Sequence, residues 1–221
     1  MELALVKLAY IIAAVFFIFG LKFMAHPRTA VRGNLFGAIG MGIAIIAAIV
    51  EVSQLPENHY GFIVAGCLLG TGLGIYLAAT VQMTSMPQLV ALFNALGGLA
   101  SVFVAGGALA LGSVETWDAL LASGVSGLIG AVTFSGSMLA AGKLKELPVF
   151  RQPIPVPGRH VIALVVVALL ILCLVLLTTR EGYLWLYIPI TLLSLGLGFL
   201  LVNPIGGADM PVVIALFNSY S

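Results

Sequence analysis

The chain has 221 residues, of which 62% are hydrophobic and only 8% are charged, and its net charge at pH 7 is +1. This composition excludes a water-soluble domain, because too few polar side chains are available to cover its surface. The chain is therefore expected in a lipid bilayer, with no nucleic-acid partner.

Apolar runs follow one another along the whole chain. A helix needs about 20 mostly apolar residues to cross the hydrocarbon. Such runs occupy residues 3–24, 34–52, 61–83, 88–112, 119–142, 160–178 and 183–202, and an eighth begins at Pro211 and is cut off at Ser221. Because the runs are continuous rather than alternating, strands are disfavoured. The sequence predicts an all-α fold, a polytopic transmembrane helical bundle with seven full spans and the start of an eighth.

The first run is read as a retained helix rather than a signal peptide, because it is too long and contains Lys7. Residues 1–221 then form one transmembrane domain, expected to be incomplete at its C-terminal end. Seven of the nine basic residues follow the first or the fifth run. The positive-inside rule places the N-terminus outside, and the loops after the first, third, fifth and seventh spans inside.

A block of residues occurs twice in the chain. SMPQLVALFN ends at Asn94 and DMPVVIALFN ends at Asn218, and residues 68–94 match residues 192–218 without a gap at an offset of 124. Four helices separate the copies, which predicts a parallel rather than an inverted internal repeat. Each copy places an asparagine about 10 Å beyond the first turn of a helix. Both asparagines are therefore expected within the bilayer, near its inner face.

The start of each repeated helix has local signals. Ser85 and Asp209 are expected to be N-caps, and Pro87 and Pro211 lie in the first turn, where a missing N–H costs nothing. Asp209 is the acidic residue of the loop NPIGGADMP. Two interpretations stay open for it: a simple helix cap, or a switch in a flexible inner loop that reports to a partner.

Small and polar residues share faces with these asparagines. Asn94 lies at helical spacing with Gly97, Gly98, Ser101 and Ala105, so it should point into the bundle. Ser221 follows Asn218 by three residues, and residues 119–142 contain a similar stripe of Ser126, Gly130, Thr133 and Ser137. The three stripes are expected to line one polar path. The alternative is that they serve only close helix packing.

Other candidate sites are weaker. The glycines of GTGLG, residues 70–74, lie inside an apolar run with no strand before them, which excludes a dinucleotide-binding loop. Cys67 and Cys173 fall in the middle of apolar runs and are interpreted as small hydrophobic residues. No metal site is expected. The histidines lie in loops or at helix ends, so none is placed to carry protons within the membrane: His26, His59 and His160.

Three stretches make the chain resemble a known family. MTSMPQLVALFNALGGLAS, GAVTFSGSMLAAGKLKELP and GGADMPVVIALFNSYS are similar to the membrane domain of the beta subunit of proton-translocating NAD(P) transhydrogenase. The resemblance implies hydride transfer between NADH and NADP⁺ in extramembrane domains, coupled to proton movement through the helices. NAD(H) and NADP(H) would bind in those domains, with no cofactor in this chain. The implied location is a bacterial inner membrane rather than a mitochondrial one.

The resemblance also implies partners and site residues. The partners are the membrane helices and NAD(H)-binding domain of an alpha subunit, an NADP(H)-binding domain that follows this segment, and a second protomer in a dimer. Asn218 matches the asparagine of NSYS, which contains Ser221; Asp209 matches the acid of GGADMP, and Ser137 matches the serine of FSGS. Asn94 stands where many members have a proton-relaying histidine.

The presence of an asparagine at position 94, in place of that histidine, leads to a hypothesis. An amide cannot take up and release a proton near pH 7, so the titratable group is expected on an alpha-subunit helix, as a histidine facing Asn94 and Asn218. Without the resemblance, two other classes of protein stay open. One is a subunit of a secondary transporter for a small ion or solute, and the other is a structural membrane anchor.

Overall fold

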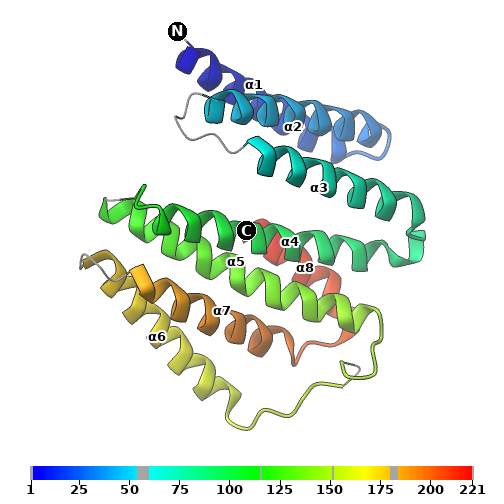
Figure 1. The fold of residues 1–221 in the computed structure, drawn as a ribbon. Helices are drawn as coiled ribbons and strands as arrows, with labels where there is room; N and C mark the ends of the chain where they lie inside the picture. Colours follow the sequence, from blue (N-terminus) through cyan, green and yellow to red (C-terminus); the bar gives the residue numbers. More distant parts are fainter. Residues whose placement is uncertain (1, 54–59, 115, 151, 180–183, 221) are drawn as a thin grey trace. The chain divides into compact units, whose positions relative to one another are not determined.

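The computed structural model describes residues 2–53, 60–114, 116–150, 152–179 and 184–220, and within these ranges every regular element is a helix. The chain divides into two compact units, residues 1–80 and 81–221. The first unit contains α1 (Glu2–Met24), α2 (Ala30–Ser53) and α3 (Tyr60–Thr80). The second contains α4 (Met86–Ala110), α5 (Trp117–Leu144), α6 (Arg159–Thr179), α7 (Tyr187–Val202) and α8 (Met210–Tyr220), with short 3₁₀ helices η1 (Met83–Ser85), η2 (Leu184–Leu186) and η3 (Gly207–Asp209) (Figure 1).

The helices coincide with the predicted apolar runs, so the all-α prediction is confirmed. Among the described residues, six helices are long and apolar enough to cross a membrane, or seven spans result if α7 and α8 are taken as one bent pair. The angle within that pair is 111°. Because α7 alone has 16 residues, shorter than the roughly 20 that a bilayer requires, the predicted count of seven full spans before an eighth is not confirmed.

In the first unit, α1 and α2 pack closely through glycines and aromatic rings. A Cβ atom added to Gly33 would lie 2.7 Å from the carbonyl oxygen of Gly20, so the two backbones touch where no side chain intervenes. The Phe36 ring packs against Phe16 and Phe23, with centroid distances of 5.4 and 5.3 Å. The small residues and the rings together fix one helix against the other.

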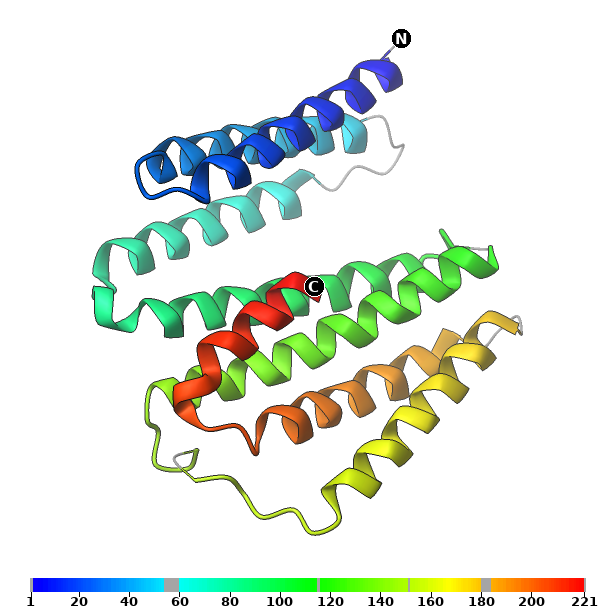
Figure 2. The same cartoon turned by 180° about the vertical axis from the view of Figure 1, so that it is seen from behind.

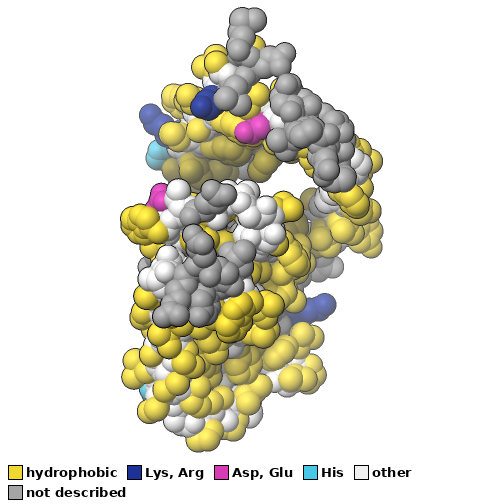
Figure 3. Space-filling view, turned by 60° about the vertical axis from the view of Figure 1, so that its left-hand side comes forward, with side chains coloured by type: hydrophobic (Ala, Val, Ile, Leu, Met, Phe, Trp, Pro, Cys, Tyr) yellow, Lys and Arg dark blue, Asp and Glu magenta, His cyan; other side chains and the backbone are white. Residues whose placement is uncertain are grey.

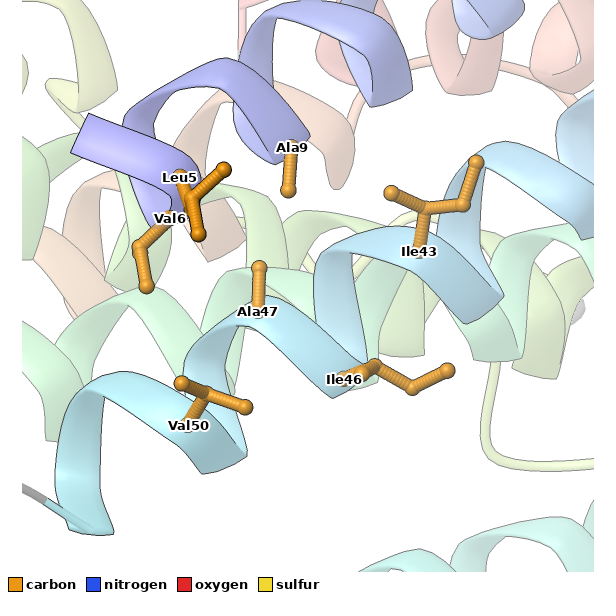
Figure 4. Close-up of a pocket in the computed structure, with 7 residues that line it drawn as sticks. All are labelled: Leu5, Val6, Ala9, Ile43, Ile46, Ala47 and Val50. Carbon is orange, nitrogen blue, oxygen red and sulfur yellow. The ribbon is translucent and has the colours of Figure 1, made fainter. Parts of the chain in front are cut away.

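An apolar hollow of about 360 Å³ lies between α1 and α2, with side chains from both helices pointing toward it (Figure 4). It is lined by Leu5, Val6, Ala9, Ile43, Ile46, Ala47 and Val50. These side chains are all hydrocarbon, so none of them offers a hydrogen-bonding or titratable group.

In the second unit, α5 is the central helix. It packs against α4 on one side and α7 on another, with α6 beyond α7, while α8 lies across α4 and α5 (Figures 1 and 2). One apolar cluster joins α4, α5, α7 and α8; its buried members are Ala91, Leu139, Ala140, Val202, Met210, Ile214 and Phe217. A second joins α6 and α7 through Leu170, Leu177, Ile190 and Leu197.

Glycines set the distances from α5 to its neighbours. A Cβ atom added to Gly98 of α4 would lie 2.6 Å from the carbonyl oxygen of Gly130, and one added to Gly130 would lie 2.5 Å from that of Gly98. On the other side, a Cβ atom on Gly198 of α7 would lie 2.5 Å from the carbonyl oxygen of Val132. The helices therefore approach backbone to backbone, as small residues allow in membrane bundles.

The outer surface is apolar. Among the side chains coloured by type in Figure 3, hydrophobic ones predominate and charged ones are sparse. On α6, Leu164 is 70% exposed and Val161 is 65% exposed. Such a surface is unfavourable in water but matches the hydrocarbon of a bilayer.

Candidate functional site

A buried hydrogen bond joins two of the predicted site residues. Asn94 of α4 is 8% exposed, and its Nδ2 donates to the Oγ of Ser137 on α5 at 2.9 Å, where Ser137 is fully buried. Asn94 therefore points into the bundle, as its spacing with small residues predicts. Gly98, one turn from Asn94, and Gly130, two turns from Ser137, approach closely, which brings the two helices near enough for these short side chains to meet.

The predicted stripe on α5 also faces inward. Gly130, Thr133 and Ser137 are buried, whereas Ser126, farther toward the start of the helix, is half-buried. Thr133 is 1% exposed, and its Oγ1 has no hydrogen-bond partner among the described residues. Thr133 and Ser137 thus lie in the interface with α4, and the Thr133 hydroxyl is unsatisfied there.

Asn218 lies elsewhere. It is exposed on α8, although its neighbour Phe217 is buried against Gly136 of α5. The structure brings Asn94 and Ser137 together but leaves Asn218 on an open side of this unit. Ser221 lies outside the described residues.

The turns that precede α4 and α8 are alike at equivalent positions of the repeat. Before η1, Gln82 has φ −71° and ψ 151°, and before η3, Gly206 has φ −71° and ψ 157°. In each case a backbone bond closes the turn, from Ser85 N to Gln82 O at 2.9 Å and from Asp209 N to Gly206 O at 3.2 Å. Both repeated helices are thus entered through the same one-turn 3₁₀ helix.

The 3₁₀ turn before α4 changes the interpretation of Ser85. Ser85 is at the N-cap position of α4, but its side chain makes no capping bond, so the prediction that it caps through its hydroxyl is wrong. The 3₁₀ turn itself satisfies the first amide, since Met86 N donates to the carbonyl of Met83. Pro87 lies in the first turn as predicted. Asp209 ends η3 and is exposed.

Lys143 is buried, although it is one of the basic residues that follow the fifth apolar run and were predicted to lie at the inner surface. It is 7% exposed, and its Nζ donates to the carbonyl oxygens of three residues at the end of α7 and beyond it: Val202 at 3.3 Å, Asn203, and Ile205 at 2.7 Å. Carbonyls at a helix C-terminus have no partner within their own helix, and a cation there is favourable. Lys143 therefore attaches the end of α5 to the segment that leads to Asp209.

Asn203 attaches the same segment to a second loop. Its side chain is 5% exposed, accepts from Ile154 N at 3.0 Å and donates to Ile154 O at 2.8 Å. At the start of α4, Gln88 Nε2 donates to Leu144 O at 3.0 Å. These polar bonds join α4, the α5–α6 loop and the α7–α8 loop. A sequence signal for them exists in Asn203-Pro204, where a proline ends α7 and leaves its carbonyls unpaired.

A hollow of about 600 Å³ opens between the two loops. Its wall includes Lys143, Glu146, Phe150 and Gln152 from the α5–α6 side, and Ile205, Gly206, Gly207 and Ala208 from the segment before Asp209. Unlike the hollow between α1 and α2, it has charged and amide groups in its wall.

His26 and His160 are exposed, and His59 lies outside the described residues. Within the described ranges, no group of three or more His, Cys, Asp or Glu side chains is arranged to hold a metal ion.

Comparisons with known proteins agree with these motifs. The family model described as NAD(P) transhydrogenase beta subunit matches residues 6–221. Two curated sequences, each named NAD(P) transhydrogenase subunit beta, one from Rhodospirillum rubrum and one from a named strain of that species, are each 40% identical to it over 226 aligned positions. The match covers 99% of this chain and 48% of each relative, so the chain spans about half the length of these relatives. With its apolar helices, the chain is a multi-pass membrane protein, and it belongs to the NAD(P) transhydrogenase beta subunit family.

Proposed function

We propose that this chain is the proton-conducting membrane domain of a proton-translocating NAD(P) transhydrogenase. In this proposal, protons cross the membrane through the second unit, while hydride passes between NADH and NADP⁺ in extramembrane domains. The hydride-transfer site then lies outside this chain. The names of its relatives support the transhydrogenase assignment.

The observation that carries the proposal is the buried bond between Asn94 and Ser137. Polar side chains in the apolar part of a membrane protein are costly, and they commonly mark ion or proton pathways. An amide and a hydroxyl both donate and accept hydrogen bonds. The pair is therefore suited to orienting a proton carrier or a water, although neither group titrates near pH 7 itself.

The proton carrier would come from a partner. We infer a histidine on an alpha-subunit helix that faces Asn94 and Asn218. The exposure of Asn218 on α8 supports this arrangement, because an amide facing hydrocarbon would leave its hydrogen bonds unmade. A partner helix over α8 would cover the amide and bring a titratable group beside it.

The coupling route would run along α5. Ser137 and Lys143 are six residues apart on this helix, or about 9 Å at 1.5 Å per residue. Lys143 holds the segment that leads to Asp209, so a small shift of α5 would move this loop. In the proposal, the loop reports to the NADP(H)-binding domain. Reciprocity then requires the nucleotide state to alter the proton affinity of the membrane site.

The remaining assignments follow from the same proposal. The N-terminus lies outside and the Asp209 loop inside, in a bacterial cell membrane. The alpha subunit, the NADP(H)-binding domain and a second protomer complete the complex. The like turns before α4 and α8 support a parallel duplication of residues 68–94 and 192–218.

Proton uptake into liposomes tests the proposal. The complete beta subunit and its alpha partner are reconstituted, hydride transfer is started outside, and a pH-sensitive dye reports the lumen. We expect uptake that requires both nucleotides and is lost with Asn218→Leu. Hydride transfer without uptake would favour a structural anchor. Uptake indifferent to nucleotides, together with solute-dependent flux, would favour a secondary transporter.

A further inference from the structure

Thr133 has a buried hydroxyl group that takes part in none of the hydrogen bonds of the candidate site. The residue is 1% exposed, and its Oγ1 has no hydrogen-bond partner among the described residues. Buried hydroxyls in proteins nearly always have a partner, from the protein or from ordered water. An unsatisfied one on a helix face that contacts another helix therefore indicates a missing partner.

The usual solution for a hydroxyl inside a helix is a bond to the carbonyl four residues earlier. Elsewhere in this chain, the side chains that adopt it are Thr80, Ser101, Ser135, Thr179 and Thr191. Ser135 does so in α5 itself, donating to Ala131 O at 3.1 Å, only two residues from Thr133. Ile129 offers the equivalent carbonyl to Thr133, but the hydroxyl makes no such bond. Its partner must be sought outside its own helix.

The position of Thr133 shows where that partner would lie. Thr133 is one turn from Ser137 on the face of α5 that contacts α4. A Cβ atom added to Gly98 of α4 would lie 3.0 Å from the Cβ of Thr133. Because Gly98 has no side chain, it offers no polar side-chain group to the hydroxyl. One turn earlier in α4, Asn94 already donates to Ser137.

We propose that Thr133 binds a water molecule in the interface between α4 and α5, and that this water continues the hydrogen-bonded chain of Asn94 and Ser137. Buried waters typically make about three hydrogen bonds to groups that would otherwise be unsatisfied. The hydroxyl of Thr133 provides one of them. Ser137 Oγ accepts from Asn94 and keeps its own hydrogen to donate to the water. Thr133 is thus a positioning residue.

This inference rests on the proposed proton path and extends it by one turn of α5. A hydroxyl and a water each hold a hydrogen to give and a lone pair to receive one. Within the segment from Ser137 through the water to Thr133, an oxygen that takes up one proton can therefore release another to its neighbour, while the Asn94 amide orients Ser137 and transfers no proton. Loss of the Thr133 hydroxyl would interrupt that segment without removing a charged group.

Two substitutions distinguish the effect of the Thr133 hydroxyl from the effect of the side chain's volume. Thr133→Val keeps the volume and removes the hydroxyl, while Thr133→Ser keeps the hydroxyl and removes a methyl group. In the reconstituted complex, we expect Thr133→Val to lower proton uptake per hydride transferred about tenfold, the factor for one lost hydrogen bond. Thr133→Ser should stay close to the wild-type ratio. Ser135→Ala is the matched control, because Ser135 is satisfied within its own helix.

A purely structural role for Thr133 predicts the opposite order. Packing alone would tolerate valine and suffer from the hole left by serine. Wild-type uptake in Thr133→Val, or loss of uptake in Thr133→Ser alone, would overturn the inference.

An experimental map of the complete complex distinguishes this inference from the proposed function. It should show a water within hydrogen-bonding distance of Thr133 Oγ1 in the wild type and none in Thr133→Val. A dry interface in the wild type overturns the inference, whether or not the complex pumps protons. A wild-type complex that never takes up protons defeats the proposed function, while a map with the water still supports the binding site.

Discussion

Lys143 Nζ lies 2.7 Å from the carbonyl oxygen of Ile205, beyond the end of α7 where the chain turns toward Asp209. The same ammonium reaches the carbonyls of Val202 and Asn203. Pro204 has no N–H and cannot extend the helix in the regular pattern. Val202 O accepts from Ile205 N at 3.1 Å, whereas the carbonyls of Asn203 and Ile205 need a donor from elsewhere. The ammonium of Lys143, in the last turn of α5, is this donor. Its hydrogen bonds connect the end of α5 to the end of α7 and the residues that follow it.

The first prediction concerns this attachment. Lys143→Met provides an apolar side chain of similar length but removes the ammonium that donates to the carbonyls of Asn203 and Ile205. We expect faster hydrogen exchange at residues 203–209 and a loss of about 2 kcal/mol in the free energy of unfolding, the scale of one hydrogen bond to a charged group. Coupled hydride transfer should slow as well. Hydrogen exchange with mass spectrometry measures the loop directly.

Lys145→Met is the control, because Lys145 is close in sequence but exposed. Removal of its charge should leave exchange at residues 203–209 unchanged. Equal effects of the two substitutions would mean that net charge at the inner surface, and not the carbonyl bonds of Lys143, stabilises the loop.

The second prediction concerns the pair Asn94 and Ser137. Asn94→Leu and Ser137→Ala each remove one side of the same bond, so their effects on unfolding should not add. The expected coupling energy in a double-mutant cycle is about 0.6 kcal/mol, the average for bonds between membrane helices. Both single variants should also lower proton uptake per hydride transferred. Additive stability effects would show that the bond does not form in the complex.

Much of the helical framework was predictable from sequence. The apolar runs predicted where each helix lies, because bilayer thickness sets their length and composition. The inward direction of Asn94 was predicted from its spacing with Gly97, Gly98, Ser101 and Ala105, since small residues mark the side where another helix approaches. Asn94, Gly98 and Ala105 are buried in α4 and Ser101 is half-buried, but Gly97 is exposed and does not belong to the packed face. Local periodicity contains this information because it concerns one helix at a time.

What the sequence did not predict depends on contacts between distant segments. Lys143 was predicted to be an inner-surface charge, but its buried position depends on where α7 ends. The exposure of Asn218 depends on how α8 packs, since α8 uses Ile214 and Phe217 against its neighbours and turns the next residue outward. The bend of 111° between α7 and α8 was likewise not predicted, so hydropathy alone did not give the number of spans.

The third prediction concerns Ser194 of α7. Ser194 is fully buried, and its Oγ has no hydrogen-bond partner among the described residues. Its helix neighbours Ile190 and Leu197 belong to an apolar cluster, away from the Asn94 and Ser137 pair. Ser194→Ala should therefore raise the free energy of unfolding by about 1 kcal/mol, because an unmade bond is removed, and leave proton uptake unchanged. Thermal unfolding in detergent measures it.

Thr191→Val is the comparison for Ser194→Ala. The Thr191 hydroxyl already donates to Tyr187 O at 2.9 Å, so its removal should bring no gain in stability. A drop in proton uptake with Ser194→Ala would instead extend the polar path to α7.

The last prediction uses two adjacent glycines of α4 that differ in their surroundings. A Cβ atom on Gly98 would lie 2.6 Å from the carbonyl oxygen of Gly130, whereas one on Gly97 would meet no heavy atom within 4 Å. Gly98→Ala should push α4 away from α5 and lower stability by about 1–3 kcal/mol, the usual cost of overpacking. The same displacement would lengthen the bond from Asn94 to Ser137, so proton uptake should fall with it.

Gly97→Ala adds the same methyl group to open space and should leave both quantities unchanged or slightly raise stability, since alanine favours a helix. If both variants behave alike in thermal unfolding and in the liposome assay, the close approach of α4 and α5 does not control the polar site.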